Sequence, residues 1–337
     1  MLAESEKSFA RLPLFDPEAG LVVRRPERSA PGYWVGAPTA IYDGARERFY
    51  LVYRRRRPRE DVLDRSYEIT IAESKDGIEF DDVWKMRKSE LSSASIEKCS
   101  LLRGHDDRYR LYVSYVDPVD SRWRIDVLES DSPDSFDTAR RSEVLTAASA
   151  SRAHDLPVEG VKDPAVYLVG RVYYMFVSFA EGIAPSHGAR RELHRTSDVY
   201  NTGLLTAPTA LATSTDGVRF RWRGRVLPVG AKGAWDAYQS RLGSIVRRGG
   251  IWYGFYDGSR SHEENYEERA GMAQSLDLIG WEKTSEDGPV FAARSGSGSV
   301  RYIEVLRLDG DLHYYYEMAT ADGSHELRAA VVPISAE

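Results

Sequence analysis

The stretch Gly160-Val161-Lys162-Asp163-Pro164-Ala165-Val166 opens an apolar run that ends at Val169, and a second run covers residues 172–177 after Gly170. Both runs are short and rich in β-branched and aromatic residues, which favours strands. The glycine between them suits a tight turn. This stretch therefore predicts a β-hairpin with an aspartate at its entrance.

The same layout recurs along the chain. Each unit has an apolar run, a turn, a second run, an alternating strand and a closing turn. The serines of the closing turn are spaced 56, 84 and 61 residues apart, at Ser74, Ser130, Ser214 and Ser275. The longer interval indicates an insertion in the third unit, roughly residues 181–205.

A period near 60 with units made only of strands is typical of a β-propeller, in which each blade is one four-stranded sheet. We predict an all-β fold, a five-bladed β-propeller with four-stranded antiparallel blades. The fifth unit shows three strands, and an N-terminal strand at Leu21–Arg25 would complete it and close the ring. The prediction is a single domain over residues 1–337, with blades at approximately 33–90, 91–147, 158–230, 235–293, and 299–333 plus 20–26.

Composition limits the classes of partner and location. The formal net charge is −6, and nucleic-acid binding needs concentrated positive charge, so no nucleic-acid partner is expected. The basic run 54–57 is interpreted as a solvated loop rather than a phosphate site. Cys99 is the only cysteine, which excludes an internal disulfide. Residues 1–7 lack a signal-peptide core and no long apolar run exists, so we expect a cytoplasmic protein without a membrane span. The sequence does not indicate an oligomeric state.

Propeller geometry predicts where a site would lie. The start of each innermost strand and the loop between the second and third strands should share one funnel. Counting seven residues back from each turn glycine aligns Ala37, Glu97, Asp163 and Ile303, and the fourth unit's equivalent falls between Gln239 and Leu242. The loops on that face would be 54–66, 117–123, 181–205 and 257–269. They are long and charged, and they hold His187, His194 and His262. Long loops in a compact domain are often functional.

Asp163 and Glu97 are the leading candidates for a catalytic carboxylate pair, with Asp236 and Glu304 as further candidates. Glycoside hydrolysis uses two carboxylates, one as acid and one as base or nucleophile. The alternative is structural: acids on inner strands would pair with Lys98, Lys162 or Arg241 and hold the blades together.

The predicted funnel also offers binding residues. Trp34 and Tyr238 have apolar ring faces on which a sugar could stack, although core packing explains each of them at least as well. The other predicted substrate-binding residues are Arg54, Lys162, Gln239, Arg241, Asp257 and His262. The histidines are too dispersed for a metal site, so no metal or other cofactor is expected. A calcium ion on the axis would not be visible in the sequence.

These repeats resemble the five-bladed propellers of glycoside hydrolase families 43, 32, 68 and 130. The resemblance rests on the blade ending Ser-x-Asp-Gly-x-x-Phe, at Ser74–Phe80 and Ser214–Phe220, and on the Gly160–Pro164 element. It implies that the partner is a carbohydrate or a glycosylated small molecule. In families 43 and 32 a first-blade aspartate is the base or nucleophile, a third-blade aspartate assists, and a fourth-blade glutamate is the general acid. Asp163 matches the third-blade aspartate.

Two of these three positions depart from the family pattern. The first blade has Ala37-Pro38, and residues 238–241 contain no glutamate. Members of family 130 use phosphate as the attacking group with one protein carboxylate and basic side chains. The resemblance to them suggests a basic cluster here, made of Arg54, Arg55, Lys162 and Arg241. However, Lys162 stands where that family has an acidic residue, and the Asp-Pro element lies in the third blade rather than the second.

The sequence therefore predicts a glycosidase-like enzyme, a hydrolase or a phosphorylase, that acts on a glycosidic bond in the axial funnel. The alternative is a non-hydrolytic sugar-binding protein, or a propeller recruited to other chemistry. Ala37 and Gln239 motivate that alternative, because they replace carboxylates. A propeller that serves protein partners is a third, less favoured interpretation, and it would show a broad apolar patch around the rim.

Overall fold

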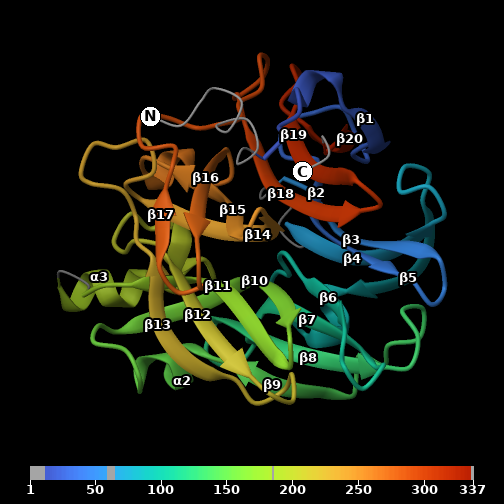
Figure 1. The fold of residues 1–337 in the computed structure, drawn as a ribbon. Coiled ribbons are helices and arrows are strands. Elements are labelled where there is room, and N and C mark those ends of the chain that lie inside the picture. Colours follow the sequence, from blue (N-terminus) through green and yellow to red (C-terminus); the bar gives the residue numbers. More distant parts are fainter. Residues whose placement is uncertain (1–11, 59–64, 184–185, 335–337) are drawn as a thin grey trace.

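The structure is a computed structural model that describes residues 12–58, 65–183 and 186–334. The segment Met1–Lys7, most of it polar, lies outside the described residues, as does part of the 54–66 loop. The described chain is almost entirely strand and turn (Figure 1). No described helix is long and apolar enough to cross a membrane.

The strands follow one another in antiparallel runs. The first run is β2 (Trp34–Asp43), β3 (Arg48–Arg56), β4 (Ser66–Ser74) and β5 (Asp81–Arg87). The second is β6 (Ser100–Arg103), β7 (Tyr109–Val116), β8 (Trp123–Ser130) and β9 (Arg141–Leu145). The third is β10 (Val158–Val169), β11 (Val172–Glu181), β12 (Thr209–Ser214) and β13 (Arg221–Leu227). The hairpin predicted around Asp163 is β10 and β11.

Two further runs complete the fold. One is β14 (Gln239–Arg248), β15 (Ile251–Ser259), β16 (Arg269–Ser275) and β17 (Trp281–Lys283). The other is β18 (Val300–Leu308), β19 (Asp311–Ala319) and β20 (His325–Pro333), with β1 (Leu21–Arg24) paired antiparallel to β20. Single parallel pairs, Arg269 with Val300 and Trp34 with His325, join the first run and these two into one twelve-stranded sheet.

Among the described residues, short helical turns lie before β1 and in the connections between strands. They are η1 (Pro17–Ala19), η2 (Lys88–Leu91), α2 (Ala147–Ser151), α3 (His187–Glu192), η3 (Val199–Asn201) and η4 (His262–Glu264). α3 and η3 lie in the predicted insertion between β11 and β12, and η4 lies in the loop between β15 and β16.

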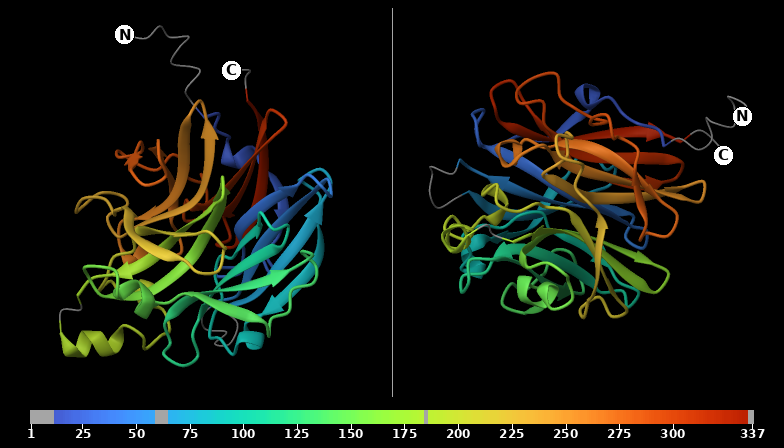
Figure 2. Two further views of the ribbon diagram at one scale, coloured as in Figure 1. Left: turned by 60° about the horizontal axis from the view of Figure 1, so that its bottom comes forward. Right: turned by 90° about the vertical axis from the view of Figure 1, so that its left-hand side faces the viewer.

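The hydrophobic core lies between neighbouring runs rather than in one centre. Val52 and Ile71 of the first run pack with Leu101 and Leu111 of the second. Equivalent clusters join the second run to the third, the third to the fourth, the fourth to the fifth, and the fifth to the first. Each sheet thus buries both faces, and Figure 2 shows the sheets side by side around a common middle.

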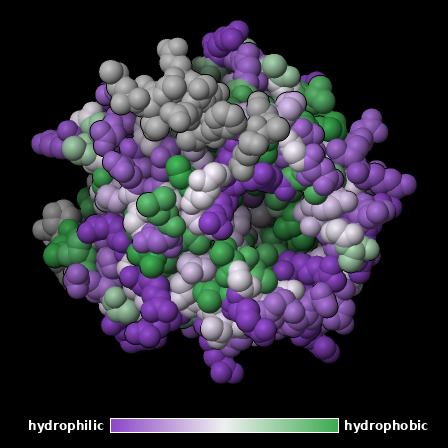
Figure 3. Space-filling view, viewed as in Figure 1, coloured by the Kyte–Doolittle hydropathy of each residue, from purple (hydrophilic) through white to green (hydrophobic). Residues whose placement is uncertain are grey.

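The face of the molecule shown in Figure 3 is mostly hydrophilic over its described residues. On the face shown in Figure 3, apolar side chains of the described residues lie in small groups among polar and charged ones. This face therefore lacks, over its described part, the broad apolar patch that a propeller built for protein partners would show.

The predicted closing turn recurs with the same hydrogen bonds. Ser74 Oγ accepts from the amides of Asp76 and Gly77, and Asp76 Oδ1 accepts from the two amides that follow. The turns at Ser214 and Ser275 repeat these bonds. Gly77, three residues after Ser74, has a positive φ of +76°, a backbone conformation that costs glycine little free energy. The motif is therefore a repeated Ser/Asp turn that ends each of these third strands.

The first strands of four runs are kinked at the same level. Their register slips after Gly36, Lys162, Leu242 and Arg301, as in β-bulges. In three of these kinks a non-glycine residue has positive φ: Ala37 (51°), Asp163 (56°) and Tyr302 (51°). Such backbone conformations tend to occur at functional sites.

Candidate functional site

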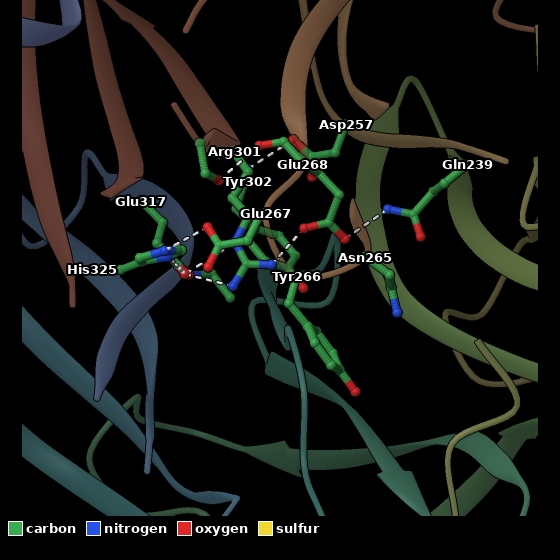
Figure 4. Close-up of polar contacts among 12 residues, drawn as sticks. Gln239, Asp257, Asn265, Tyr266, Glu267, Glu268, Arg301, Tyr302, Glu317 and His325 are labelled. Atoms are coloured by element: carbon green, nitrogen blue, oxygen red, sulfur yellow. Dashed lines mark hydrogen bonds and ion pairs between the residues drawn. The ribbon is translucent and has the colours of Figure 1, made fainter. Parts of the chain in front are cut away.

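Seven buried side chains of alternating charge form a chain of ion pairs at the level of the kinks. We call it the charge ring, and its members, in order, are Glu97, Arg54, Glu317, Arg301, Glu268, Arg241 and Asp163. They come from all five strand runs, and each side chain is at most 3% exposed. Figure 4 shows the part around Arg301.

One half of the charge ring joins the first, second and fifth runs. Arg54 Nε lies 3.0 Å from Glu97 Oε2, and Arg54 Nη2 lies 3.5 Å from Glu317 Oε2. Arg301 Nη2 donates to Glu317 Oε1 at 2.6 Å. Because these groups are buried together, each charge is offset by its neighbours rather than by water.

The other half joins the fourth, third and second runs. Arg301 donates to Glu268 at 2.5 Å, and Arg241 Nη2 lies 3.4 Å from the other oxygen of Glu268. Arg241 Nη1 donates to Asp163 Oδ2 at 2.9 Å, while Asp163 Oδ1 accepts from the amide of Lys98 at 3.2 Å. Since Lys98 follows Glu97 in the chain, the ring closes through the backbone.

Tyr302 packs against the guanidinium groups of the ring. Its ring centroid lies 4.0 Å from Arg241, 5.0 Å from Arg301 and 5.6 Å from Arg54. The face of an aromatic ring attracts cations, so Tyr302 adds to the stabilisation of three arginines at once. Its amide donates to Asp257 Oδ1 at 2.9 Å.

The carboxyl groups of the cluster differ in proton affinity. Burial raises the pKa of Glu97, but Arg54 and Lys162 outweigh burial and hold the pKa below its usual range. Burial likewise acts against Arg301 and Arg54 at Glu317, whose pKa lies well below normal. At Asp257 burial wins over Arg241 and raises the pKa to about 6. Asp257 is therefore the carboxyl of this cluster that can exchange a proton near neutral pH.

A second cluster, of arginines and aromatic rings, adjoins the charge ring. The Arg56 guanidinium lies between the rings of Trp34, at 4.3 Å, and Tyr266, at 4.0 Å. Arg56 is buried, and its Nε and Nη1 have no hydrogen-bond partner among the described residues. Burial lowers its pKa. Arg65 lies 3.8 Å from Asp198, to which Tyr266 donates a hydrogen bond. Buried N–H groups without partners are costly unless a ligand supplies an acceptor.

One carboxylate of the site is partly exposed. Glu267 has 31% of its side chain exposed and lies 3.0 Å from His325 Nε2, while His325 Nδ1 lies 2.7 Å from Glu317 (Figure 4). Although burial raises the pKa of Glu267, the hydrogen bond from His325 outweighs burial and lowers it.

Most of the predicted site residues come together here. Asp163, Glu97, Arg54 and Arg241 are in the charge ring, where Asp163 pairs with Arg241, a partner named in the structural alternative, and Glu97 pairs with Arg54, which that alternative did not name. Their neighbours are Lys162 (3.8 Å from Asp163), Asp257 (2.9 Å from Arg241), Gln239 (2.9 Å from Glu268) and Trp34 (stacked on His325).

Other predicted residues lie elsewhere. Asp236 contacts Lys283 and the Tyr256 hydroxyl within the fourth run. Glu304 lies in β18 and lines a separate cavity. The Tyr238 hydroxyl donates to the Tyr200 carbonyl at 2.7 Å, and its ring lies 6.3 Å from that of the exposed His262.

Several members of the site are not predicted from the sequence: Arg56, Glu267, Glu268, Arg301, Tyr302, Glu317 and His325. A signal for some of them exists. Glu267 and Glu268 lie in the 257–269 loop, one of the loops predicted to face the funnel. The same loop rule, applied to the fifth unit, would point to Glu317 and His325 on either side of the 320–324 turn.

The described residues contain no group of three or more His, Cys, Asp or Glu side chains arranged to hold a metal ion. Arginine and lysine side chains lie among the carboxylates of the site. Their guanidinium and ammonium groups are the fixed positive charges available to a ligand.

Comparison with known proteins shows likeness in structure only. No protein-family model matches the chain, and no curated protein matches it in sequence. A thermostable family-43 glycoside hydrolase aligns with a TM-score of 0.61 at 13% identity, covering 90% of this chain and 90% of that chain. The GH43_1 enzyme from Xanthomonas citri complexed with xylotriose has a TM-score of 0.61 at 12% identity, covering 94% and 91%.

The third comparison is a phosphorylase. β-1,2-Mannobiose phosphorylase from Listeria innocua, in complex with β-1,2-mannobiose, has a TM-score of 0.60 at 14% identity, covering 94% of this chain and 96% of that chain. At these identities the likeness shows the fold. The fold is that of the β-propeller glycoside hydrolases and phosphorylases, which confirms the family resemblance at the level of structure.

Proposed function

We propose that this protein is a single-domain, five-bladed propeller, closed by β1, that cleaves a glycosidic bond of a carbohydrate with an inorganic anion such as phosphate as the attacking group. The observation that carries the proposal is Arg56, a buried guanidinium whose Nε and Nη1 are unpartnered among the described residues, beside Trp34 and Tyr266. A bound anion would supply the missing acceptors, and arginine recognises phosphate well.

The pairing of the carboxylates favours this chemistry over two-carboxylate hydrolysis. Hydrolysis needs a second carboxylate free to attack or to activate water. Glu97 and Asp163, the leading pair, each bind a guanidinium of the charge ring. Attack by an anion removes that need, because one protein acid is then sufficient.

The proposed step balances as follows. A phosphate oxygen forms a bond to the anomeric carbon, the glycosidic C–O bond breaks, and the leaving oxygen takes a proton from Asp163. Asp163, Asp257 and Glu268 all lie around the Arg241 guanidinium, and Glu268 is also paired with Arg301. Burial raises the pKa of Asp257 to about 6, so this carboxyl can take up a proton near neutral pH and return it to Asp163.

Binding without cleavage is the second candidate function. It is favoured by the burial of the charge ring, whose carboxylates are at most 3% exposed and already paired. In that case the arginines would recognise an acidic or phosphorylated sugar and the ring would only hold the sheets together.

Product analysis separates these candidates. A panel of disaccharides, including β-1,2-mannobiose and xylobiose, is incubated with the protein with and without inorganic phosphate. We expect a sugar phosphate, detected by mass, only when phosphate is present. Release of free sugars at equal rates without phosphate would contradict the proposed attack. Sugar binding seen by calorimetry with no turnover would establish the second candidate.

A further inference from the structure

Away from the charge ring, a cavity of about 340 Å³ opens between the later parts of the first strands. Its wall is mostly apolar and includes Leu101 of β6, Val166 of β10 and Leu306 of β18, with Trp252 of β15 beside them. By volume, it has room for about ten water molecules. None of the residues at the charge ring or around Arg56 lines it.

A single buried carboxyl group faces this apolar space without full pairing. Glu304 lines the cavity, is 1% exposed, and its Oε2 has no hydrogen-bond partner among the described residues. Its Oε1 accepts from the Tyr167 hydroxyl at 3.4 Å. Lys98 Nζ lies 3.8 Å from Oε2, beyond hydrogen-bond distance, and donates instead to Thr39 Oγ1 at 2.9 Å. Glu304 thus offers an acceptor that the described chain leaves unused.

Most of the other polar groups around the cavity have partners, the exception being Arg103 Nε, which has no hydrogen-bond partner among the described residues. Thr39 Oγ1 donates to the Cys99 carbonyl at 2.6 Å, and the Tyr167 hydroxyl accepts from the Ile245 amide at 3.2 Å. Arg103 pairs with Asp43 at 2.8 Å and Asp107 at 3.0 Å. A ligand would therefore meet mostly apolar walls that include the side chains of Tyr42, Tyr167 and Trp252, together with one carboxyl group and the Arg103 side chain.

We propose that this cavity is a second binding site, for a small organic amine with an apolar body, whose ammonium group donates to Glu304 Oε2. A charge-assisted hydrogen bond is about twice as strong as a neutral one, so an ammonium uses this acceptor better than a hydroxyl. The apolar body replaces water on the walls. This site is independent of the proposed anion site.

Binding of an amine is coupled to the ionisation of Glu304. Burial raises the pKa of this carboxyl to about 8, against the effects of Lys98 and the Tyr167 hydroxyl. The remaining titratable groups of the lining are Tyr42 and Arg103. Since the amine needs the carboxylate, binding below pH 8 releases a proton. Affinity should fall about tenfold per pH unit between pH 7.5 and 6 and level off above pH 8.

Calorimetry on the full chain tests the site with phenethylamine, 2-phenylethanol and 3-phenylpropanoate. We expect the amine to bind at least tenfold more tightly than the alcohol or the acid, and to release about one proton at pH 7, measured in buffers of different ionisation enthalpy. Glu304→Gln should weaken the amine at least tenfold and leave the alcohol unchanged. Val169→Trp, which fills the cavity, should weaken both.

The contradicting results are equally specific. Equal affinities for amine and alcohol, or an amine affinity that does not change between pH 6 and 8, would overturn the proposal using the native protein alone. Unchanged amine binding in Glu304→Gln or in Val169→Trp would place the ligand elsewhere. Because neither residue lies near Arg56, sugar phosphorolysis should persist in both variants whichever way the amine experiment turns out.

Discussion

Replacing Arg241 by methionine is expected to lower the free energy of unfolding by about 3–5 kcal/mol, because the change strands buried carboxylates without their counter-charge. Arg241 lies within 3.4 Å of Asp163, Asp257 and Glu268 and is 1% exposed. Methionine keeps much of the volume but offers no donor. Denaturant unfolding at pH 7.5 measures the loss.

The stability that Arg241→Met loses relative to wild type should depend on pH. Its direction should be opposite to ordinary acid denaturation, in which a falling pH destabilises the protein. Without Arg241 the stranded carboxyls have folded-state pKa values above those of the unfolded chain, so they bind more protons when folded. The deficit relative to wild type should therefore shrink as the pH falls from 7.5 toward 5. Arg221→Met, on the exposed face of β13, is the matched control and should stay within about 0.5 kcal/mol of wild type. A loss below about 1 kcal/mol in Arg241→Met would show that the charge ring does not stabilise the fold.

Asp163→Asn should reduce turnover by about 10²- to 10³-fold if Asp163 protonates the leaving oxygen. The asparagine keeps the shape, and Arg241 retains Asp257 and Glu268, so the variant should fold. The diagnostic measurement compares two substrates that carry the sugar identified with the disaccharide panel: the natural glycoside and an activated one. With a dinitrophenyl glycoside, whose leaving group needs no proton, the loss should be below about tenfold. Equal losses on both substrates would assign Asp163 a structural role.

Asp134→Asn is the control for this substitution, since Asp134 is exposed and lies on a surface turn. It should match wild type on both substrates. A similar loss of turnover in Asp134→Asn would show that the assay does not respond specifically to changes at the candidate site.

The fold is predictable because its signals are local and repeated. Short stretches of sequence are enough to identify the Ser/Asp turn after the third strand of a unit, as at Ser74–Phe80 and Ser214–Phe220. The same is true of the alternation of apolar runs. The pairing of β1 with β20 is also expected, since the last unit lacks an outer strand. Each of these inferences needs only strand geometry and a count of residues.

The site is predictable only in part. Asp163, Glu97 and Arg241 lie at the starts of inner strands, where periodicity fixes their level, and all three meet at the charge ring. Their partners Arg301 and Glu268 come from other runs, and ion pairs between residues so far apart leave no spacing signal. Glu304 illustrates the limit. The sequence identifies its strand, but the bulge after Arg301 shifts the register of β18, so the alternation of side chains along the strand cannot be counted through it.

Arg56 shows the same limit. It lies in a basic run that composition alone describes as a solvated loop, and the structure buries it between Trp34 and Tyr266. Tyr266 lies 210 positions further along the chain (266 − 56), so only the folded arrangement shows that this arginine is desolvated.

Binding of inorganic phosphate to the protein tests the central claim most directly. Calorimetric titration of wild type, Arg56→Met and the exposed control Arg221→Met should give one saturable site in wild type and in the control. In Arg56→Met the affinity should fall at least tenfold, and salt should weaken binding in wild type because the contact is ionic. Equal phosphate affinity in all three proteins, or no saturable site in wild type, would contradict the proposed anion site.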